Sequence, residues 1–430
     1  MIVKNIVIIL LFLMTASLEA KTVNIVIQGF IDHQNVDEFG KTAYHFIKRA
    51  EKKGEKVYFG SPKKYYFANE NVNYQDIKTV KDVKKLMQAV KKDLGPNDQV
   101  NLLVNGHGFS TKNERRPENT GLVLDKEKLT HKKLGDLIWD NIPFFTKVKM
   151  IAPYCFSGGI HTIAFDRPRT CSVSATDFRT PSYGEGDIFS GGTTTAFGSK
   201  RSLLIRKNPN MSFEESFQRT AEKDFLNDQR GTTSSMAYLK KLLGEGAYKK
   251  RQSWWERMTD YHAPYTKGAN PIKELCKDFD KDDYLIGKKV TPFIKQVQTI
   301  VERSEFEDIF SDASIPDFVI KRYRDIWNRY KDNFPAFLKK YNDQRSSYEM
   351  MIPSFTRGED GSLVEVSQLP WNQAQMVNEF QNEVRQSFSH LLYLYKIKND
   401  LRLIKRLYNE KDRFDIGVFE RLVECENGQL

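Results

Sequence analysis

Short apolar runs alternate with amphipathic segments over the first 200 residues of the chain. Runs of the strand type fall at 23–29, 56–60, 99–107, 147–155 and 170–176. Segments with helical spacing lie between them, at 36–50, 80–94 and 130–140, and Gly121–Asp125 is hairpin-like. The second of these helices starts at Thr79 with Asp82 three residues on, which is a capping-box pattern. This alternation predicts an α/β fold, a mostly parallel sheet with helices on both faces.

The pattern becomes helical after about residue 200. Helix is expected over Glu214–Leu243 and over most of the remaining sequence, and the apolar stripe of Met376–Tyr408 is typical of the core of a helical bundle. Loops are expected at Pro264–Pro271 and Met351–Pro370. We therefore expect an α/β domain over 21–240 and an all-α C-terminal region over 241–430.

The N-terminus has the layout of a secretory signal peptide. Lys4 precedes an apolar stretch, Ile6–Met14, and small residues then lead to Ala20. We expect cleavage after residue 20 and export to the periplasm or the extracellular space; an uncleaved anchor is the alternative. Beyond this segment the sequence contains no apolar run long enough for a membrane-spanning helix.

The net charge of +11 is concentrated in the first 240 residues, which carry about ten of the surplus positive charges. Many of the lysines lie on predicted helix faces, where a solvated surface is the simplest interpretation. Nucleic acid is not an expected partner because the basic residues lack interleaved aromatic residues. Attraction to an acidic envelope or substrate surface is the alternative.

The chain has four cysteines, too few for a disulfide scaffold in an exported protein of 430 residues. If Cys155 is a free thiol, at most one pair forms among the others, for which Cys276–Cys425 is one option, and Cys171 is expected in the core. We expect no metal and no cofactor, since neither a CxxC nor an HExxH motif occurs.

Two of the predicted strands end in reactive side chains, His107 and Cys155. The carboxyl ends of parallel strands meet at one edge of an open sheet, where α/β proteins build their sites. A thiol nucleophile needs an acid–base partner, and histidine is suited to that role. A buried structural thiol is the alternative for Cys155.

The residues around Cys155 favour reactivity. A helix beginning at Ile160 would lower the pKa of the thiol through its dipole, and the glycines at 158 and 159 would let backbone amides approach a substrate. The amides of Gly108 and Cys155 are candidate donors to the oxyanion of an acyl intermediate.

An apolar strand ending in His-Gly, followed by a second ending in Cys-x-Ser-Gly, resembles the caspase-like fold of clan CD cysteine peptidases, nearest to the legumain type. The resemblance covers about residues 21–200, and the 48 residues between His107 and Cys155 are close to the caspase spacing of about 50. It implies that His107 and Cys155 form a catalytic dyad with Gly108 as an oxyanion donor. The helical C-terminal region is expected to cover the cleft, as the helical C-terminal region of legumain-type proteins does, or to bind substrate.

The segment Ser174–Ser182 resembles the lining of the legumain specificity pocket, which makes Asp177 the first candidate for substrate binding. Ser182 and Asp187 are further candidates; an exposed turn aspartate is the alternative for Asp177. Legumains and metacaspases usually carry an acid where this chain has Pro153, and the caspase Gln-Ala-Cys-x-Gly signature is absent, so no known specificity carries over.

The sequence therefore predicts an exported cysteine endopeptidase that acts on proteins or peptides through an acyl-enzyme. The alternatives are a transpeptidase using the same dyad, an inactive caspase-like scaffold or binding protein, and a helical effector with an incidental α/β domain. The oligomeric state is left open.

Overall fold

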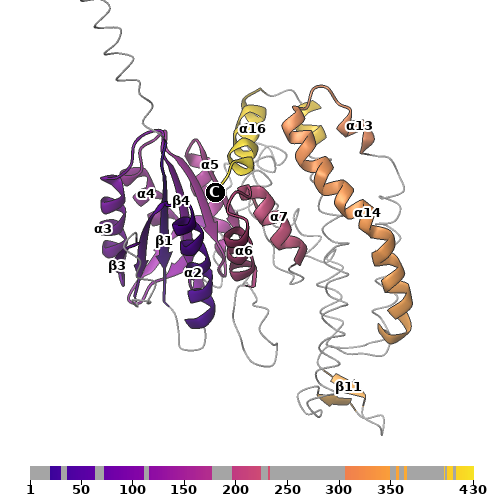
Figure 1. Ribbon diagram of the computed structural model, residues 1–430, viewed down its shortest axis with the longest axis horizontal. Coiled ribbons are helices and arrows are strands. Elements are labelled where there is room, and N and C mark those ends of the chain that lie inside the picture. The colour runs from indigo at the N-terminus through magenta and orange to yellow at the C-terminus, as the bar shows by residue number, and fades with distance from the viewer. Residues whose placement is uncertain are drawn as a thin grey trace, which may run out of the picture.

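The computed structural model describes the chain in segments that carry the sheet and the helices around it (Figure 1). The described residues are 20–30, 36–62, 72–110, 116–176, 196–223, 231–232, 306–348, 355–357, 363–365, 401, 404–409 and 413–430. The predicted signal peptide, apart from Ala20, lies outside them, as do Cys276 and most of the region 241–430.

Six parallel strands form the centre of the molecule, in the order β9-β8-β4-β1-β2-β3, and β10 adds a short antiparallel strand beside β9. Their bounds are β1 Thr22–Gln28, β2 Lys56–Ser61, β3 Val72–Asp76, β4 Gln99–Asn105, β8 Lys147–Ala152, β9 Thr170–Ser174 and β10 Gly231–Thr232. The prediction of a mostly parallel α/β sheet is confirmed. The edge strand β3 was not predicted, because its sequence VNYQD is largely polar.

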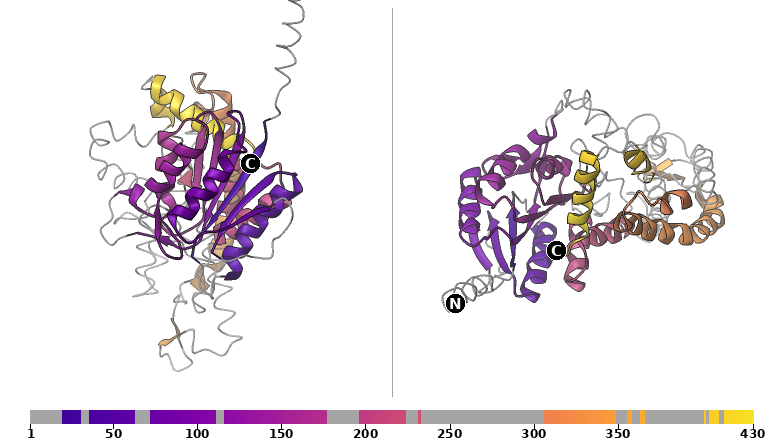
Figure 2. Two further views of the ribbon diagram at one scale, coloured as in Figure 1. Left: turned by 90° about the vertical axis from the view of Figure 1, so that its left-hand side faces the viewer. Right: turned by 90° about the horizontal axis from the view of Figure 1, so that it is seen from above.

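Helices cover both faces of the sheet (Figure 2). One core cluster joins the sheet to α3 Val80–Lys91, α4 His131–Asn141 and α5 His161–Asp166. The other joins the opposite face to α2 Val36–Lys52, α6 Ala196–Lys207, α7 Phe213–Lys223 and α16 Arg413–Asn427. The predicted capping box of α3 is confirmed, since Thr79 and Asp82 exchange side-chain and backbone hydrogen bonds.

A small antiparallel sheet lies beyond the end of β4. Its strands are β5 Gly108–Phe109, β6 Gly121–Val123 and β7 Lys128–Thr130, and the 3-10 turn η1 Pro117–Asn119 precedes β6. The hydrogen bond from the Val123 amide to the His107 carbonyl (2.8 Å) ties this sheet to the chain that leaves β4.

The later part of the chain contains α13 Glu307–Phe310, the long helix α14 Asp317–Tyr348 and the hairpin β11 Phe355–Arg357 with β12 Leu363–Glu365. The hairpin occupies a segment predicted as loop. Within the described residues no helix is both long enough and apolar enough to cross a bilayer.

A disulfide joins Cys171 of β9 to Cys425 of α16 and brings the end of the chain onto the sheet. Cys171 is buried, as expected, but the option of pairing Cys276 with Cys425 is wrong because Cys425 is bonded to Cys171. Leu430, 2% exposed, belongs to the core beneath α2 and α7. Residues 413–430 therefore pack as part of the α/β layer although they follow β9 by more than 200 positions.

Candidate functional site

The strand register places the chain after β4 beside the chain after β8. Gln99 of β4 pairs with Lys147 of β8, and Leu103 pairs with Ile151. Each paired residue of β4 therefore lies opposite the β8 residue that is 48 positions later in the sequence. Cys155 also follows His107 by 48 positions. Both residues lie just beyond the carboxyl ends of their strands, at the same edge of the sheet.

Gly108 shows how closely these two segments approach. A Cβ atom at this position would overlap the carbonyl oxygen of Cys155 and would lie 2.8 Å from the Tyr154 ring. Residue 108 must therefore be glycine for the backbone that follows His107 to rest against the backbone of Cys155.

His107 lies near two aromatic rings. The Phe39 ring meets it edge to face, with centroids 5.2 Å apart, and the Phe30 ring is 6.3 Å away. The buried Asn105 side chain donates a hydrogen bond to the Phe39 carbonyl (2.8 Å), which fixes the start of α2 against this edge. Packing against these rings restricts where the imidazole can point.

A glycine also shapes the exit from β4. Gly106 has φ of +133°, a conformation that disfavours side chains, and a Cβ there would lie 3.1 Å from the backbone of Gly29. This turn carries the chain from the buried strand to His107.

Cys155 is a half-buried thiol outside the disulfide, in a tightly held turn. Phe156, directly after it, adopts the left-handed conformation (φ 60°, ψ 24°), which costs a non-glycine residue about 1 kcal/mol or more. The buried Ser157 side chain accepts hydrogen bonds from the amides of Ala175 and Thr176 (3.2 and 3.3 Å). Strain of this kind, held by surrounding hydrogen bonds, is common at functional turns.

A buried polar chain supports the residue before the cysteine. The Tyr154 hydroxyl is 2.7 Å from His131 Nε2, and His131 Nδ1 is 3.1 Å from the Thr120 hydroxyl. Burial lowers the pKa of His131 to about 4, so the ring is neutral at neutral pH. Since Nδ1 also faces the Pro117 carbonyl (3.4 Å), which only accepts, we assign the ring proton to Nδ1 and the Tyr154 hydroxyl as donor to Nε2.

Gly159 allows close packing of the turn after the cysteine. A Cβ at Gly159 would overlap the Pro117 carbonyl and His131 Nδ1, so this glycine lets the turn pack against the polar chain. The turn continues as a 3-10 helix, Ser157–Ile160, and α5 begins only at His161. The helix expected from Ile160 is therefore present one residue later, and the 3-10 turn lies between it and Cys155.

The three predicted substrate-binding residues, Asp177, Ser182 and Asp187, lie outside the described residues. His161 is fully buried between the hydroxyls of Ser172 and Ser174 (2.8 and 3.0 Å).

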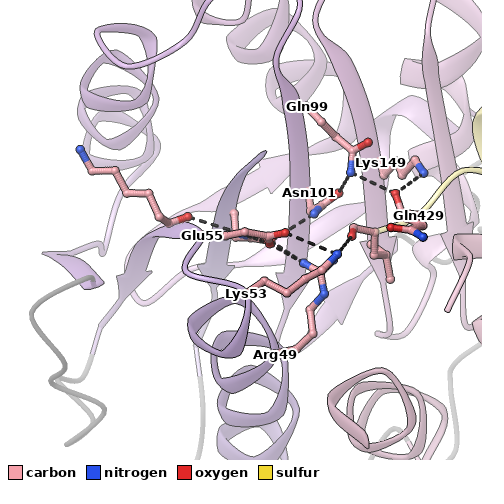
Figure 3. Close-up of polar contacts among 10 residues, drawn as sticks. Arg49, Lys53, Glu55, Gln99, Asn101, Lys149 and Gln429 are labelled. Carbon is pink, nitrogen blue, oxygen red and sulfur yellow. Dashed lines mark hydrogen bonds and ion pairs between the residues drawn. The ribbon is translucent and has the colours of Figure 1, made fainter. Parts of the chain in front are cut away.

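A second polar cluster lies near the opposite edge of the sheet (Figure 3). Asn24, Asn101 and Lys149 occupy one cross-strand row, on the face covered by α2 and α16. Arg49 donates to Glu55 (2.6 Å) and to Asn24 (3.3 Å), and Asn101 donates to Asn24 (3.1 Å).

The backbone carbonyls of Gln429 and Leu430 also belong to this second cluster. Lys149 Nζ and Gln99 Nε2 both donate to the Gln429 carbonyl (2.6 and 3.1 Å), and Lys53 Nζ donates to the Leu430 carbonyl (3.3 Å) (Figure 3). Burial, with the nearby charges of Lys147, Arg49 and Arg201, lowers the pKa of Lys149 to about 7. Sequence reasoning missed this cluster, although polar residues at matching positions of otherwise apolar strands were a readable signal.

Within the described residues no three His, Cys, Asp or Glu side chains gather as a metal site would require. No known family model matches the chain, and no curated protein is significantly similar to it. The arrangement at the carboxyl edge therefore has to be interpreted from its own chemistry.

Proposed function

We propose that this protein is an exported cysteine peptidase of the caspase-like type, with Cys155 as nucleophile and His107 as its acid–base partner. The supporting observation is the strand register, which gives β4 and β8 the same 48-residue offset that separates the two residues. The close approach of Gly108 to the Cys155 carbonyl supports the same pairing.

The proposed reaction needs a peptide, the thiol, the imidazole and water. The Cys155 sulfur attacks the peptide carbonyl, and a C–S bond forms as the C–N bond breaks. His107 transfers the thiol proton to the leaving amine, and water then releases the acyl group and restores the thiol. The amides of Gly108 and Cys155 would donate to the oxyanion, a contribution typically worth about 100–1000-fold in turnover per donor.

The surroundings of Cys155 fit a nucleophile that must hold one position. Phe156 stores backbone strain, Ser157 holds the turn, and the neutral His131 anchors Tyr154 without adding charge. A rigid turn favours the attacking geometry because less motion has to be lost on reaching the transition state.

The substrate is proposed to be a protein or peptide, with Asp177, Ser182 and Asp187 contributing to its recognition. The signal-peptide layout supports delivery to the periplasm or the extracellular space, and the disulfide fits an oxidising compartment. We also propose that the region 241–430 acts together with this site.

Thiol labelling tests the dyad directly. A dilute alkylating probe should modify Cys155 in the wild-type protein at neutral pH, and His107→Ala should slow modification at least about tenfold because the thiolate loses its partner. His45→Ala removes an imidazole from α2, outside the proposed dyad, and should leave the rate unchanged. Equal labelling of wild type and His107→Ala would contradict the dyad.

A peptide-library cleavage profile tests the activity itself. Wild type should cleave a defined subset of peptides and Cys155→Ala none; Asp177→Asn should change the preferred subset. A reactive Cys155 without cleavage of any peptide would favour the scaffold interpretation instead.

A further inference from the structure

Three aromatic side chains are exposed at the amino-terminal edge of the sheet, opposite the candidate site. Trp139 near the end of α4 is 43% exposed, and Phe144 and Phe145 in the turn before β8 are 47% and 60% exposed. The Phe144 ring contacts both of the others, with centroids 5.7 Å from Trp139 and 5.2 Å from Phe145. A contiguous group of exposed aromatic rings is typical of a binding surface.

Two cations contact the backbone beside this aromatic group. Arg169 donates a hydrogen bond to the Phe145 carbonyl and Lys91 donates to the Asp140 carbonyl, both at 2.8 Å. The exposed cations of this edge are Lys21, Lys91, Lys92, Lys147 and Arg169. They outnumber the exposed carboxylates of α4, Asp136 and Asp140. We name this group of aromatic and basic residues the basic aromatic edge.

The edge is continuous along the starts of three neighbouring strands. The Lys147 amide donates to the Asp98 carbonyl (3.0 Å), and the Gln99 amide donates to the Lys21 carbonyl (2.9 Å). Lys21 immediately precedes β1, so an exposed cation lies at the start of that strand as well.

We propose that the basic aromatic edge docks the protein on a membrane surface rich in anionic phospholipid. Trp and Phe side chains enter the interfacial layer, and lysine and arginine side chains pair with phosphate groups. His107 and Cys155, at the opposite edge of the sheet, then face away from the bilayer and stay open to soluble or envelope-bound peptides.

Cosedimentation with phospholipid vesicles tests the proposal with the full chain. Wild type should bind vesicles of phosphatidylglycerol mixed with phosphatidylcholine, bind pure phosphatidylcholine much more weakly, and release as salt is raised. Lys91→Glu with Lys92→Glu should lower partitioning into the anionic vesicles at least about tenfold, since each cation contributes about fivefold. Phe144→Ser with Phe145→Ser should lower it by a similar factor.

Matched controls are available on α14, which lies away from α3 in Figures 1 and 2. Lys321→Glu with Lys339→Glu makes the same charge change, and Phe318→Ser removes another exposed aromatic ring (40% exposed). Both should bind within about twofold of wild type, and thermal unfolding verifies that every variant is folded.

Three outcomes would overturn the proposal: no binding of wild type to anionic vesicles, an equal loss in the α14 controls, or binding to a soluble polyanion but not to vesicles. Labelling of Cys155 should be unchanged in the edge variants, so failure here is distinguishable from failure of the proposed peptidase activity.

Discussion

Gly108 is the residue at which the two halves of the candidate site meet. Because a Cβ there would overlap the Cys155 carbonyl, Gly108→Ala should force the segments apart. We expect a loss of about 1–3 kcal/mol in the free energy of unfolding, together with loss of the His107 effect on Cys155 labelling.

Gly417 is a matched control for that substitution. It lies inside α16 with no atom within 4 Å of a built Cβ, so Gly417→Ala should stabilise the protein by about 0.5–1 kcal/mol. Urea unfolding measures both variants. A Gly108→Ala protein as stable and as reactive as wild type would contradict the close approach.

Lys149 predicts a pH dependence of stability. Its pKa of about 7 in the folded protein lies below the ordinary 10.5, so between these values the unfolded chain holds a proton that the folded chain lacks. The free energy of unfolding should therefore rise between pH 7 and pH 9, by up to about 1.4 kcal/mol per pH unit from this group. Below pH 7 the folded and the unfolded chain both carry the proton on Lys149, so this group no longer changes the free energy of unfolding with pH.

Lys149→Met removes the titrating amine and retains much of its volume. Urea unfolding at several pH values should show a shallower rise for this variant than for wild type. Identical slopes would mean that Lys149 does not titrate in this range.

At the scale of elements, the disulfide between β9 and α16 closes a span of 254 residues. Replacing both partners, Cys171→Ala with Cys425→Ala, should cost about 3–5 kcal/mol because the unfolded chain regains its freedom. Cys155→Ala, which removes a thiol but no bond, should cost less than about 1 kcal/mol. A double variant with unchanged denaturant midpoint would exclude a stabilising role for the bond.

Elements whose local pattern agrees with their burial were predictable from the sequence. The strands β1, β4 and β8 are mostly apolar along their buried lengths, and α3 carries its own capping box. The edge strand β3 was not, because half-exposed polar residues such as Gln75 obscure the period. The Cys171–Cys425 pair was not predictable either, since local sequence does not encode a contact over 254 residues.

Some residues of the candidate site were predictable from the sequence and others were not. His107 and Cys155 were predictable because each follows an apolar strand, whereas Tyr154, His131 and Thr120 come together only through the packing of α4 and the small sheet on the turn after β8.

At the scale of the whole molecule, one buried ion group joins the long helix to the α/β layer. Arg322 of α14 lies 2.8 Å from Glu426 of α16 and 3.4 Å from Glu214 of α7. The two carboxylates raise the pKa of Arg322 against the opposing effect of burial, so it stays charged. Arg322→Met should cost about 3–5 kcal/mol because it leaves buried carboxylates without their cation.

The same group offers its own control. Adding Glu214→Gln and Glu426→Gln to Arg322→Met removes the uncompensated charges and should recover more than half of the loss in thermal or urea unfolding. A triple variant no more stable than Arg322→Met would show that the charges are not the cause.

The position of Leu430 in the core has a consequence for biosynthesis. The nascent chain reaches β9 long before residues 425–430 are made, so the face beneath α2 and α7 stays incomplete until those residues have been synthesised. That face therefore closes late in the folding of the α/β layer, and its disulfide forms only where thiols are oxidised. The disulfide then holds this late segment on a strand made more than 200 residues earlier.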